Sequence, residues 1–238
     1  MGSSRPAAGG GRWVEVDPAR LPEWLAGFTA RHGDSTTVAV GAGRVLVITG
    51  ADGAAAELHP PPGTAVGGAE LARFLADVQA PRRLGLLLAR KSAAAVGVAH
   101  GDRLVRSKVD SWYVQGRTAA GGQSQQRFAR RRGNQAAAAA GKAADIVARV
   151  LLPVAGQLAA VVTGGDRRTV DSILADPRLL RLAGLRAERH LPVPTPNLAV
   201  LQAAVPAARA VHIHLPAPVA EPDAGGAGYT GAVLRCED

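Results

Sequence analysis

Apolar residues recur at helical spacing in two stretches near the N-terminus. They are Leu21, Trp24, Leu25 and Phe28 in the first stretch and Leu71, Phe74, Leu75 and Val78 in the second. Residues three and four apart lie on one side of a helix, so these spacings predict a helix after a short extended piece within 13–31 and another over 69–79. Two β-rich runs between them, 36–42 and 44–49, predict a hairpin. The pattern indicates a small α+β region over residues 13–80.

The pattern becomes strand-rich from residue 82. Three runs, 84–91, 94–100 and 103–109, predict consecutive strands, with Gly101-Asp102 as the hairpin turn between the last two. An alanine-rich stretch then predicts a long helix from Ser124 to about residue 152, which Pro153 ends. The residues between the last strand and this helix, 115–125, are predicted to form a loop.

Strands and helices alternate over the last third of the chain. The predicted strands are 158–163, 185–193 and 211–215, and the predicted helices are 167–175 and 196–207. Gly164-Gly165-Asp166 lacks the lysine of a P-loop and is predicted to be a turn into a helix rather than a phosphate cradle. Alternation after a meander predicts an α/β fold, a mixed sheet flanked by helices, over residues 81–215. Residues 1–12 are predicted to be a flexible leader and residues 216–238 a largely flexible tail.

Composition excludes several classes of protein. The only cysteine, Cys236, can form neither an internal disulfide nor a cysteine-based zinc site. No apolar run approaches the roughly 18 residues that span a bilayer, and the N-terminus has no signal h-region. His212 and His214 alternate on a predicted strand, but no third metal ligand is evident. The sequence predicts a cytoplasmic protein with no membrane partner, no metal and no organic cofactor.

The net charge of +9 is concentrated in one part of the chain. Residues 101–150 carry ten basic and three acidic side chains, whereas residues 1–100 carry ten and eight and residues 151–238 carry eight and eight. Such a local excess is expected of a surface that binds a phosphate backbone. A basic run is more often a solvated helix face, so the motif within this stretch decides between the two interpretations.

That motif is Gly121-Gly122-Gln123. Two glycines allow backbone torsions closed to other residues and leave no Cβ in the way of a ligand. The amide of Gln123 donates and accepts hydrogen bonds but does not titrate near neutral pH, which excludes it as a general acid or base. It is suited to holding a water and a carbonyl in attack geometry.

The run from Gly121 to Arg130, Gly-Gly-Gln-Ser-x-x-Arg-Phe-Ala-Arg, resembles the peptidyl-transferase-centre loop and following helix in the middle domain of archaeal and eukaryotic class I release factors. The lead-in from Tyr113-x-Gln115 and the lack of flanking domains resemble the release-factor-like peptidyl-tRNA hydrolases of ribosome-associated quality control, including their short actinobacterial members. The resemblance covers residues 84–215 in pattern and 113–132 in specific residues. It implies that the α/β region has the ribonuclease-H-like fold of the release-factor middle domain.

The resemblance also implies a site built on the loop. Gly121, Gly122 and Gln123 would be catalytic, with Gln123 orienting water on the ester that joins the nascent peptide to the terminal adenosine of tRNA. Gln125 stays an alternative catalytic amide, because Gly122-Gln-Ser-Gln125 also satisfies the spaced pattern of eukaryotic quality-control members. The candidates for RNA binding are Arg106, Arg117, Arg127, Arg130, Arg131, Arg132 and Lys142.

The implied partners are the large ribosomal subunit at its peptidyl-transferase centre, peptidyl-tRNA and rRNA, contacted by a monomer. No codon-reading domain is evident, so the resemblance implies codon-independent release from stalled ribosomes or large subunits. Two other functions stay open. One is an endonuclease that removes the tRNA 3′ end, for which no group activating the ribose 2′-hydroxyl is evident, and the other is a non-catalytic ribosome-binding or RNA-binding factor. Asp102, Asp110 and Asp166 would suit a nuclease-like carboxylate cluster, but all three lie at predicted turns.

Overall fold

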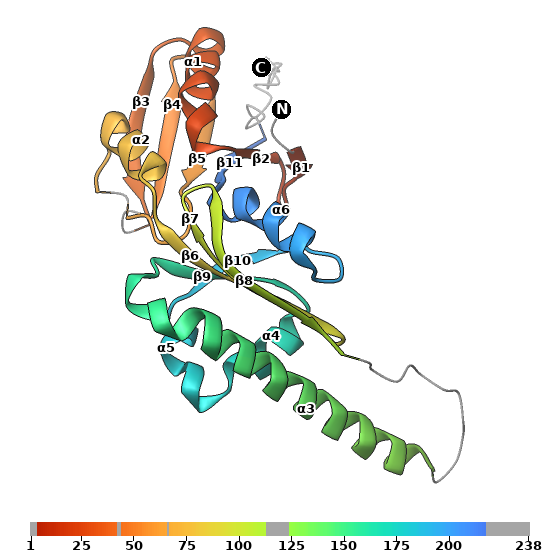
Figure 1. The fold of residues 1–238 in the computed structure, drawn as a ribbon. Helices are drawn as coiled ribbons and strands as arrows, with labels where there is room; N and C mark the ends of the chain where they lie inside the picture. The colour runs from red at the N-terminus through yellow and green to blue at the C-terminus, as the bar shows by residue number, and fades with distance from the viewer. Residues whose placement is uncertain (1–3, 42–43, 66, 113–123, 218–238) are drawn as a thin grey trace, which may run out of the picture.

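The protein is described here by a computed structural model that covers residues 4–41, 44–65, 67–112 and 124–217, with only the helical backbone described over residues 124–134. These residues form two β-sheets with helices packed on them (Figure 1). The first sheet has the order β1-β2-β11-β5-β4-β3 and the second β10-β9-β6-β7-β8. Their strands are β1 Ser4–Pro6, β2 Arg12–Val16, β3 Ser35–Val40, β4 Val45–Gly50, β5 Ala55–His59, β6 Arg83–Arg90, β7 Ala93–His100, β8 Arg103–Ser111, β9 Ala160–Gly165, β10 Arg186–Leu191 and β11 Val211–Leu215.

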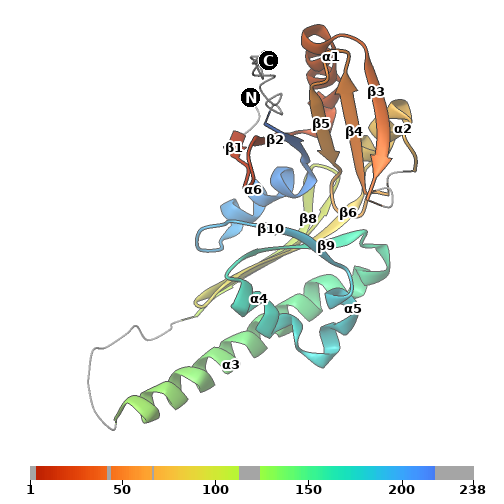
Figure 2. The ribbon, with the colours of Figure 1, turned by 180° about the vertical axis from the view of Figure 1, so that it is seen from behind.

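Helices cover one face of the first sheet and both faces of the second (Figures 1 and 2). They are α1 Leu21–His32, α2 Leu71–Gln79, α3 Ser124–Leu151, α4 Arg167–Leu174, α5 Leu180–Ala183 and α6 Leu198–Arg209, with short 3-10 turns at Pro18–Arg20, Leu152–Gln157 and Pro177–Leu179. In the second sheet β6, β7 and β8 form an antiparallel meander, whereas β9 and β10 run parallel to β6. The predicted α/β fold, a mixed sheet flanked by helices, is confirmed.

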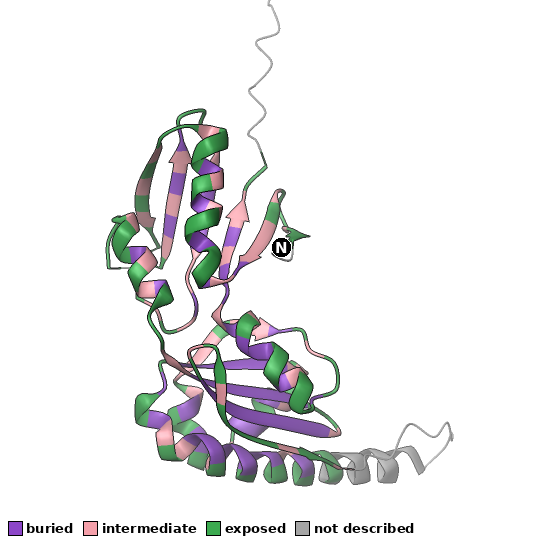
Figure 3. Cartoon of the chain, turned by 45° about the horizontal axis from the view of Figure 1, so that its top comes forward, coloured by how far each residue is buried: buried purple, intermediate pink, exposed green. Residues whose placement is uncertain are grey.

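The first sheet buries its inward face against α1 and α2. Leu46, Ile48 and Leu58 come from the strands, and Phe28 and Phe74 come from the two helices. The exposed positions of α1 and α2 face away from the sheet (Figure 3). This is the amphipathic arrangement that the helical spacing of the apolar residues predicts.

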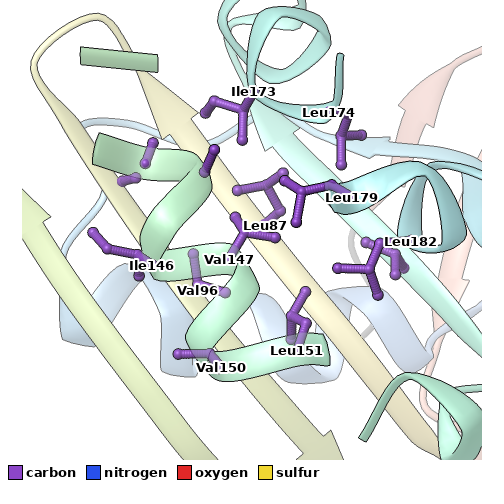
Figure 4. Packing of buried hydrophobic residues seen from close by; sticks show 14 of the residues in the cluster. Leu87, Val96, Ile146, Val147, Val150, Leu151, Ile173, Leu174, Leu179 and Leu182 are labelled. Atoms are coloured by element: carbon purple, nitrogen blue, oxygen red, sulfur yellow. The ribbon is translucent and has the colours of Figure 1, made fainter. Parts of the chain in front are cut away.

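The second sheet buries both faces. The C-terminal half of α3 packs on one face through Val147 and Leu151, which meet Leu87 and Val96 from the strands and Leu182 from α5 (Figure 4). On the other face, Leu201 and Val205 of α6 pack against Leu86 and Leu88. Because β6 and β7 are covered on both sides, their sequences read as continuous apolar runs, as expected for buried central strands.

The position of the last strand differs from the prediction. Residues 211–215 form β11 as predicted, but β11 pairs antiparallel with β2 and β5 and therefore belongs to the first sheet and not to the second. In this position Val211 and Ile213 are buried, whereas His212 and His214 face the other way. A strand of that pattern suits a sheet with one covered face.

Two shorter strands were also absent from the prediction. Residues 4–6, assigned to a flexible leader, form β1 and pair with β2 through backbone hydrogen bonds. Gly9, Gly10 and Gly11 all have positive φ and make the turn between the two strands. The short strand β5 contains Ala-Ala-Glu, which has little intrinsic β propensity; it is held by pairing with β4 on one side and β11 on the other.

Candidate functional site

The Gly-Gly-Gln loop connects β8 to α3. Gly121, Gly122 and Gln123, together with Arg117, lie outside the described residues. Gln125 belongs to the first turn of α3, and Arg127, Arg130, Arg131 and Arg132 follow on the same helix, where the backbone alone is described. The surroundings of the loop are therefore defined by the two elements that flank it and by the end of the second sheet.

The strand that leads to the loop carries basic side chains on one face. Arg106 pairs across the strands with Val98, and Lys108 pairs with Val96. Both valines belong to the core beneath α3, and paired residues point to the same side of a sheet, so Arg106 and Lys108 lie on the α3 side. Both are exposed because β8 is the edge strand. Arg106 was predicted to bind RNA and Lys108 was not, although residues two apart along a strand lie on the same face.

The helix that follows the loop is longer than the core it covers. Its 28 residues span about 42 Å at 1.5 Å per residue. The described part of α3 is exposed over residues 135–138, and the side of the helix that faces the sheet is buried from Ala139 onward. Its N-terminal half projects past the ends of β6, β7 and β8 (Figures 1 and 2). We name this projecting part, residues 124–138, the arm.

Two further cations lie where α3 is packed on the sheet. Lys142 and Arg149 are both exposed, and because they are seven residues apart they share one side of the helix. The opposite side of α3 faces α4, where Ala137 and Gly141 line a cavity with Ser172. Lys142 and Arg149 therefore lie on the flank of α3 away from α4, and α3 also packs against β8, the strand that carries Arg106 and Lys108. No ion pair joins any of these four side chains to another described residue.

The start of the loop is anchored to the sheet by Trp112. The indole Nε1 donates to the carbonyl oxygen of Lys91 at 2.6 Å, and the backbone N of Trp112 donates to that of Ser92 at 2.8 Å. Lys91 and Ser92 form the turn between β6 and β7. The tryptophan also packs against the core beneath α3. The loop therefore leaves the sheet from a fixed point beside the β6–β7 turn.

The turn from β9 into α4 lies at the same end of the sheet. A Cβ on Gly165, whose φ is +93°, would fall 2.3 Å from the carbonyl oxygen of Ala89, so only glycine fits this close approach. Asp166 then caps α4, with Oδ1 accepting from the backbone N of Thr169 at 2.7 Å. The chain enters α4 at Asp166 as predicted, but Gly164 and Gly165, expected in the turn, are the last paired residues of β9.

Replacing Asp166 with alanine is expected to lower the free energy of unfolding by about 1 kcal/mol, because the cap is lost. Hydrogen bonds from Thr169, helped by the charges of Lys91 and Arg168, hold the pKa of Asp166 below its ordinary value of 3.8. A lowered carboxyl pKa stabilises the fold above the ordinary value, and this stability is lost as pH falls through the folded-state value. Urea unfolding at neutral and acid pH measures both effects, and Asp166→Asn should keep much of the cap while losing the pH dependence.

The structure separates the carboxylates considered for nuclease chemistry. Asp102 lies at the β7–β8 hairpin, whereas Asp110 lies near the far end of β8, about 26 Å away for an extended strand. The hypothesis of a nuclease-like carboxylate cluster that contains both Asp102 and Asp110 is therefore wrong. Among the residues that the structure describes, no three His, Cys, Asp or Glu side chains are placed to hold a metal ion. Within the same residues, no helix combines the length and apolar character needed to cross a membrane.

Comparison with known proteins matches this region to one family. The family model described as acVLRF1, the Actinobacteria/chloroflexi VLRF1 release factor, matches residues 82–214. This stretch begins at the second sheet and includes β8, the loop and α3. Among curated proteins, none matches the chain.

Solved structures give more distant similarities. An archaeal translation termination factor, aRF1, is 17% identical with a TM-score of 0.42, over 69% of this chain and 47% of that one. A structure described as an archaeal protein is 19% identical with a TM-score of 0.35, over 67% and 46%. Pelota from Archaeoglobus fulgidus is 11% identical with a TM-score of 0.28, over 85% and 63%. The chain spans about half the length of the first two.

Proposed function

This chain belongs to the Actinobacteria/chloroflexi VLRF1 release factor family, and we propose that it is a codon-independent peptidyl-tRNA hydrolase. In this proposal it frees nascent peptides from stalled ribosomes or large subunits in the cytoplasm, and it acts as a monomer. The observation that carries the proposal is the position of Gly121-Gly122-Gln123, directly before α3 and within the residues that the family model matches.

The chemistry required of the loop is positioning. The bond between peptide and tRNA is an activated ester, so a well-placed water and a donor for the developing oxyanion supply most of what hydrolysis needs. Gln123 offers an amide that can hold water without exchanging a proton. Gly121 and Gly122 allow the backbone N–H groups to approach the ester closely. No metal or organic cofactor takes part in this mechanism.

The placement of the cations supports a site that contacts RNA. Arg106 and Lys108 lie on the strand entering the loop, and Lys142 lies on the helix leaving it. In the proposal these residues, together with Arg117 and the arginines of the arm, hold rRNA or tRNA phosphates while the arm carries the loop toward the peptidyl-transferase centre. The arginine fork suits phosphate oxygens.

Product analysis on stalled ribosomal complexes tests the function. The complexes carry peptidyl-tRNA labelled in both the peptide and the tRNA, and the full chain is added in excess. Hydrolysis releases free peptide and leaves a tRNA with an intact 3′ end, which is the expected result. A peptide that still carries nucleotides would identify an endonuclease, and tight binding without cleavage would identify a non-catalytic factor; either outcome overturns the proposal.

A further inference from the structure

A second group of cations lies at the loop end of the second sheet. Lys91 is in the β6–β7 turn, and Arg167 and Arg168 begin α4. All three side chains are exposed. The carbonyl of Lys91 accepts the indole hydrogen bond of Trp112, so this group stands beside the point where the loop leaves the sheet. Both ribbon views place α4 nearer than α5 to these strand ends (Figures 1 and 2). We name Lys91, Arg167 and Arg168 the basic rim.

The members of the basic rim come from separate segments but lie close together. Lys91 and Arg168 are 77 positions apart in the chain, yet both lie beside Asp166. The backbone N of Asp166 donates to the carbonyl oxygen of Ala89, two residues before Lys91, at 2.8 Å. The charges of Lys91 and Arg168 also help to hold the pKa of Asp166 below its ordinary value. Two acidic side chains lie at this end of the sheet: Asp166, whose Oδ1 accepts the hydrogen bond that caps α4, and Asp110 of β8, whose Oδ1 accepts from the backbone N of Ser111. The three cations of the rim outnumber these two carboxylates, so the charge at this end of the sheet stays net positive.

The side chains of the rim form no ion pair with another described residue, although an acidic side chain lies within reach on α4. Asp171 is four residues after Arg167 and three after Arg168, the spacings at which a helical ion pair forms. Asp171 instead pairs with Arg186 of β10 at 2.6 Å. Among the described residues, no ion pair involves Lys91, Arg167 or Arg168.

The position of the two arginines also works against helix stability. The first turn of a helix favours acidic side chains, because the N-terminal end of the helix dipole is positive. The first turn of α4 has no acidic residue and begins with two arginines. Two cations that gain no ion pair and lie at an unfavourable position are better explained by an anion from another molecule than by the stability of this fold.

We propose that the basic rim is a second RNA contact, which binds backbone phosphates beside the point where the chain enters the loop. This rests on the proposed function, because it makes RNA the partner. The chemistry of the rim suits phosphate, because its side chains offer two guanidinium groups and one ammonium. The indole N–H of neighbouring Trp112 is not available to a ligand, because it already donates to the carbonyl oxygen of Lys91. The rim thus adds cations from α4 and the β6–β7 turn beside Trp112, the last described residue before the loop.

Binding to purified large ribosomal subunits over a series of salt concentrations tests the rim. The variants are Arg167→Gln with Arg168→Gln, and Lys91→Gln. The control with matched charge is Arg31→Gln with Arg181→Gln, which removes two exposed arginines from α1 and α5. Each phosphate contact contributes about 0.7 to 0.9 to the slope of log affinity against log salt. The double rim variant should therefore lose about 1.5 of the slope, and the control should keep the slope of the unchanged protein.

Thermal unfolding of the same variants separates binding from folding. Because the arginines occupy an unfavourable helical position, the double rim variant should unfold no earlier than the unchanged protein. Equal slopes in the rim variant and the unchanged protein, or an equal loss in the rim variant and the control, would overturn the proposal. Peptide release by the unchanged protein is measured in parallel. A protein that releases no peptide but shows the rim-dependent slope refutes the hydrolase and keeps the RNA contact.

Discussion

Replacing Gln123 with alanine is expected to slow peptide release by about 100-fold to 1,000-fold while leaving ribosome binding unchanged. Removing one preorganised donor from a site that stabilises a developing oxyanion costs roughly this factor. The side chain is assigned positioning and not affinity, so its loss should appear in the rate of the chemical step. Single-turnover release from complexes that already hold the protein measures that step directly.

Gln125→Ala is the matched control. Gln125 lies within the first turn of α3, whereas Gln123 immediately precedes Ser124, where the helix begins. A residue in the helix is constrained by helical geometry, so we assign the ester-facing amide to Gln123 and expect release by Gln125→Ala to stay within a few-fold of the unchanged protein. A large loss confined to Gln125→Ala would transfer the catalytic role to that residue. Full activity in both variants would remove the loop from catalysis.

The elements that depend on local pattern could be predicted from the sequence. The long helix was expected from Ser124 to about residue 152 and is found over Ser124–Leu151, because alanine-rich sequence and the following Pro153 define it locally. The β7–β8 hairpin follows from Gly101-Asp102 in the same way, with Gly101 at a φ of +58°. Pairing between distant segments could not be predicted. His212 lies opposite Glu15, and no local signal reveals which of two sheets a five-residue strand will join.

For the candidate site too, residues close together in the sequence could be predicted, whereas a group formed by distant segments could not. The excess of charge in residues 101–150 pointed to β8 and α3, and the structure places Arg106 and Lys142 on neighbouring elements, exposed as an RNA-binding role requires. Lys91 and Arg168 were not predicted to bind RNA, because each belongs to a pair of adjacent basic residues, Arg90-Lys91 and Arg167-Arg168, that lies far from the Gly-Gly-Gln motif in the sequence. They become a group only when β6 and β9 pair in the sheet and bring their ends together.

Arg189 is expected to contribute most to holding the two sheets together. Its Nη1 donates to the carbonyl oxygens of Ala208 at 3.0 Å and Ala210 at 2.7 Å, and Nη2 donates to that of Pro60 at 3.5 Å. These contacts join β10 to the C-terminal end of α6 and to the segment after β5. The carbonyls at a helix end have no partner within the helix, and a cation there is favourable to the helix dipole. Burial lowers the pKa of Arg189 to about 10, which leaves it charged at neutral pH.

Arg189→Met is expected to lower the free energy of unfolding by about 3 kcal/mol at neutral pH, because buried carbonyls lose a charged donor while the aliphatic volume is largely kept. The free energy of unfolding of Arg189→Lys should lie between those of Arg189→Met and the unchanged protein, since an ammonium cannot reach the same set of oxygens as a planar guanidinium. Urea denaturation gives the values. Arg181→Met, which changes an exposed arginine on α5, is the control and should stay within about 0.5 kcal/mol of the unchanged protein. A similar small loss in Arg189→Met would show that the bonds add nothing to stability.

The same variant should also change how stability depends on pH, through His212. Burial first, and then the charge of Arg189, lower the pKa of His212 from 6.5 to about 3. A histidine whose pKa is lowered by folding binds its proton more readily in the unfolded chain, so stability is complete above about pH 6.5 and falls as the pH drops toward 3. Without the charge of Arg189, the pKa of His212 should rise toward its ordinary value, and stability should fall less steeply. The difference in free energy of unfolding between Arg189→Met and the unchanged protein should therefore become smaller as the pH falls. With His212→Gln in the background, the narrowing should become smaller, and what remains comes from His59, whose pKa the charge of Arg189 also lowers. A difference that stays constant or widens in the presence of His212 would show that Arg189 and His212 are not coupled.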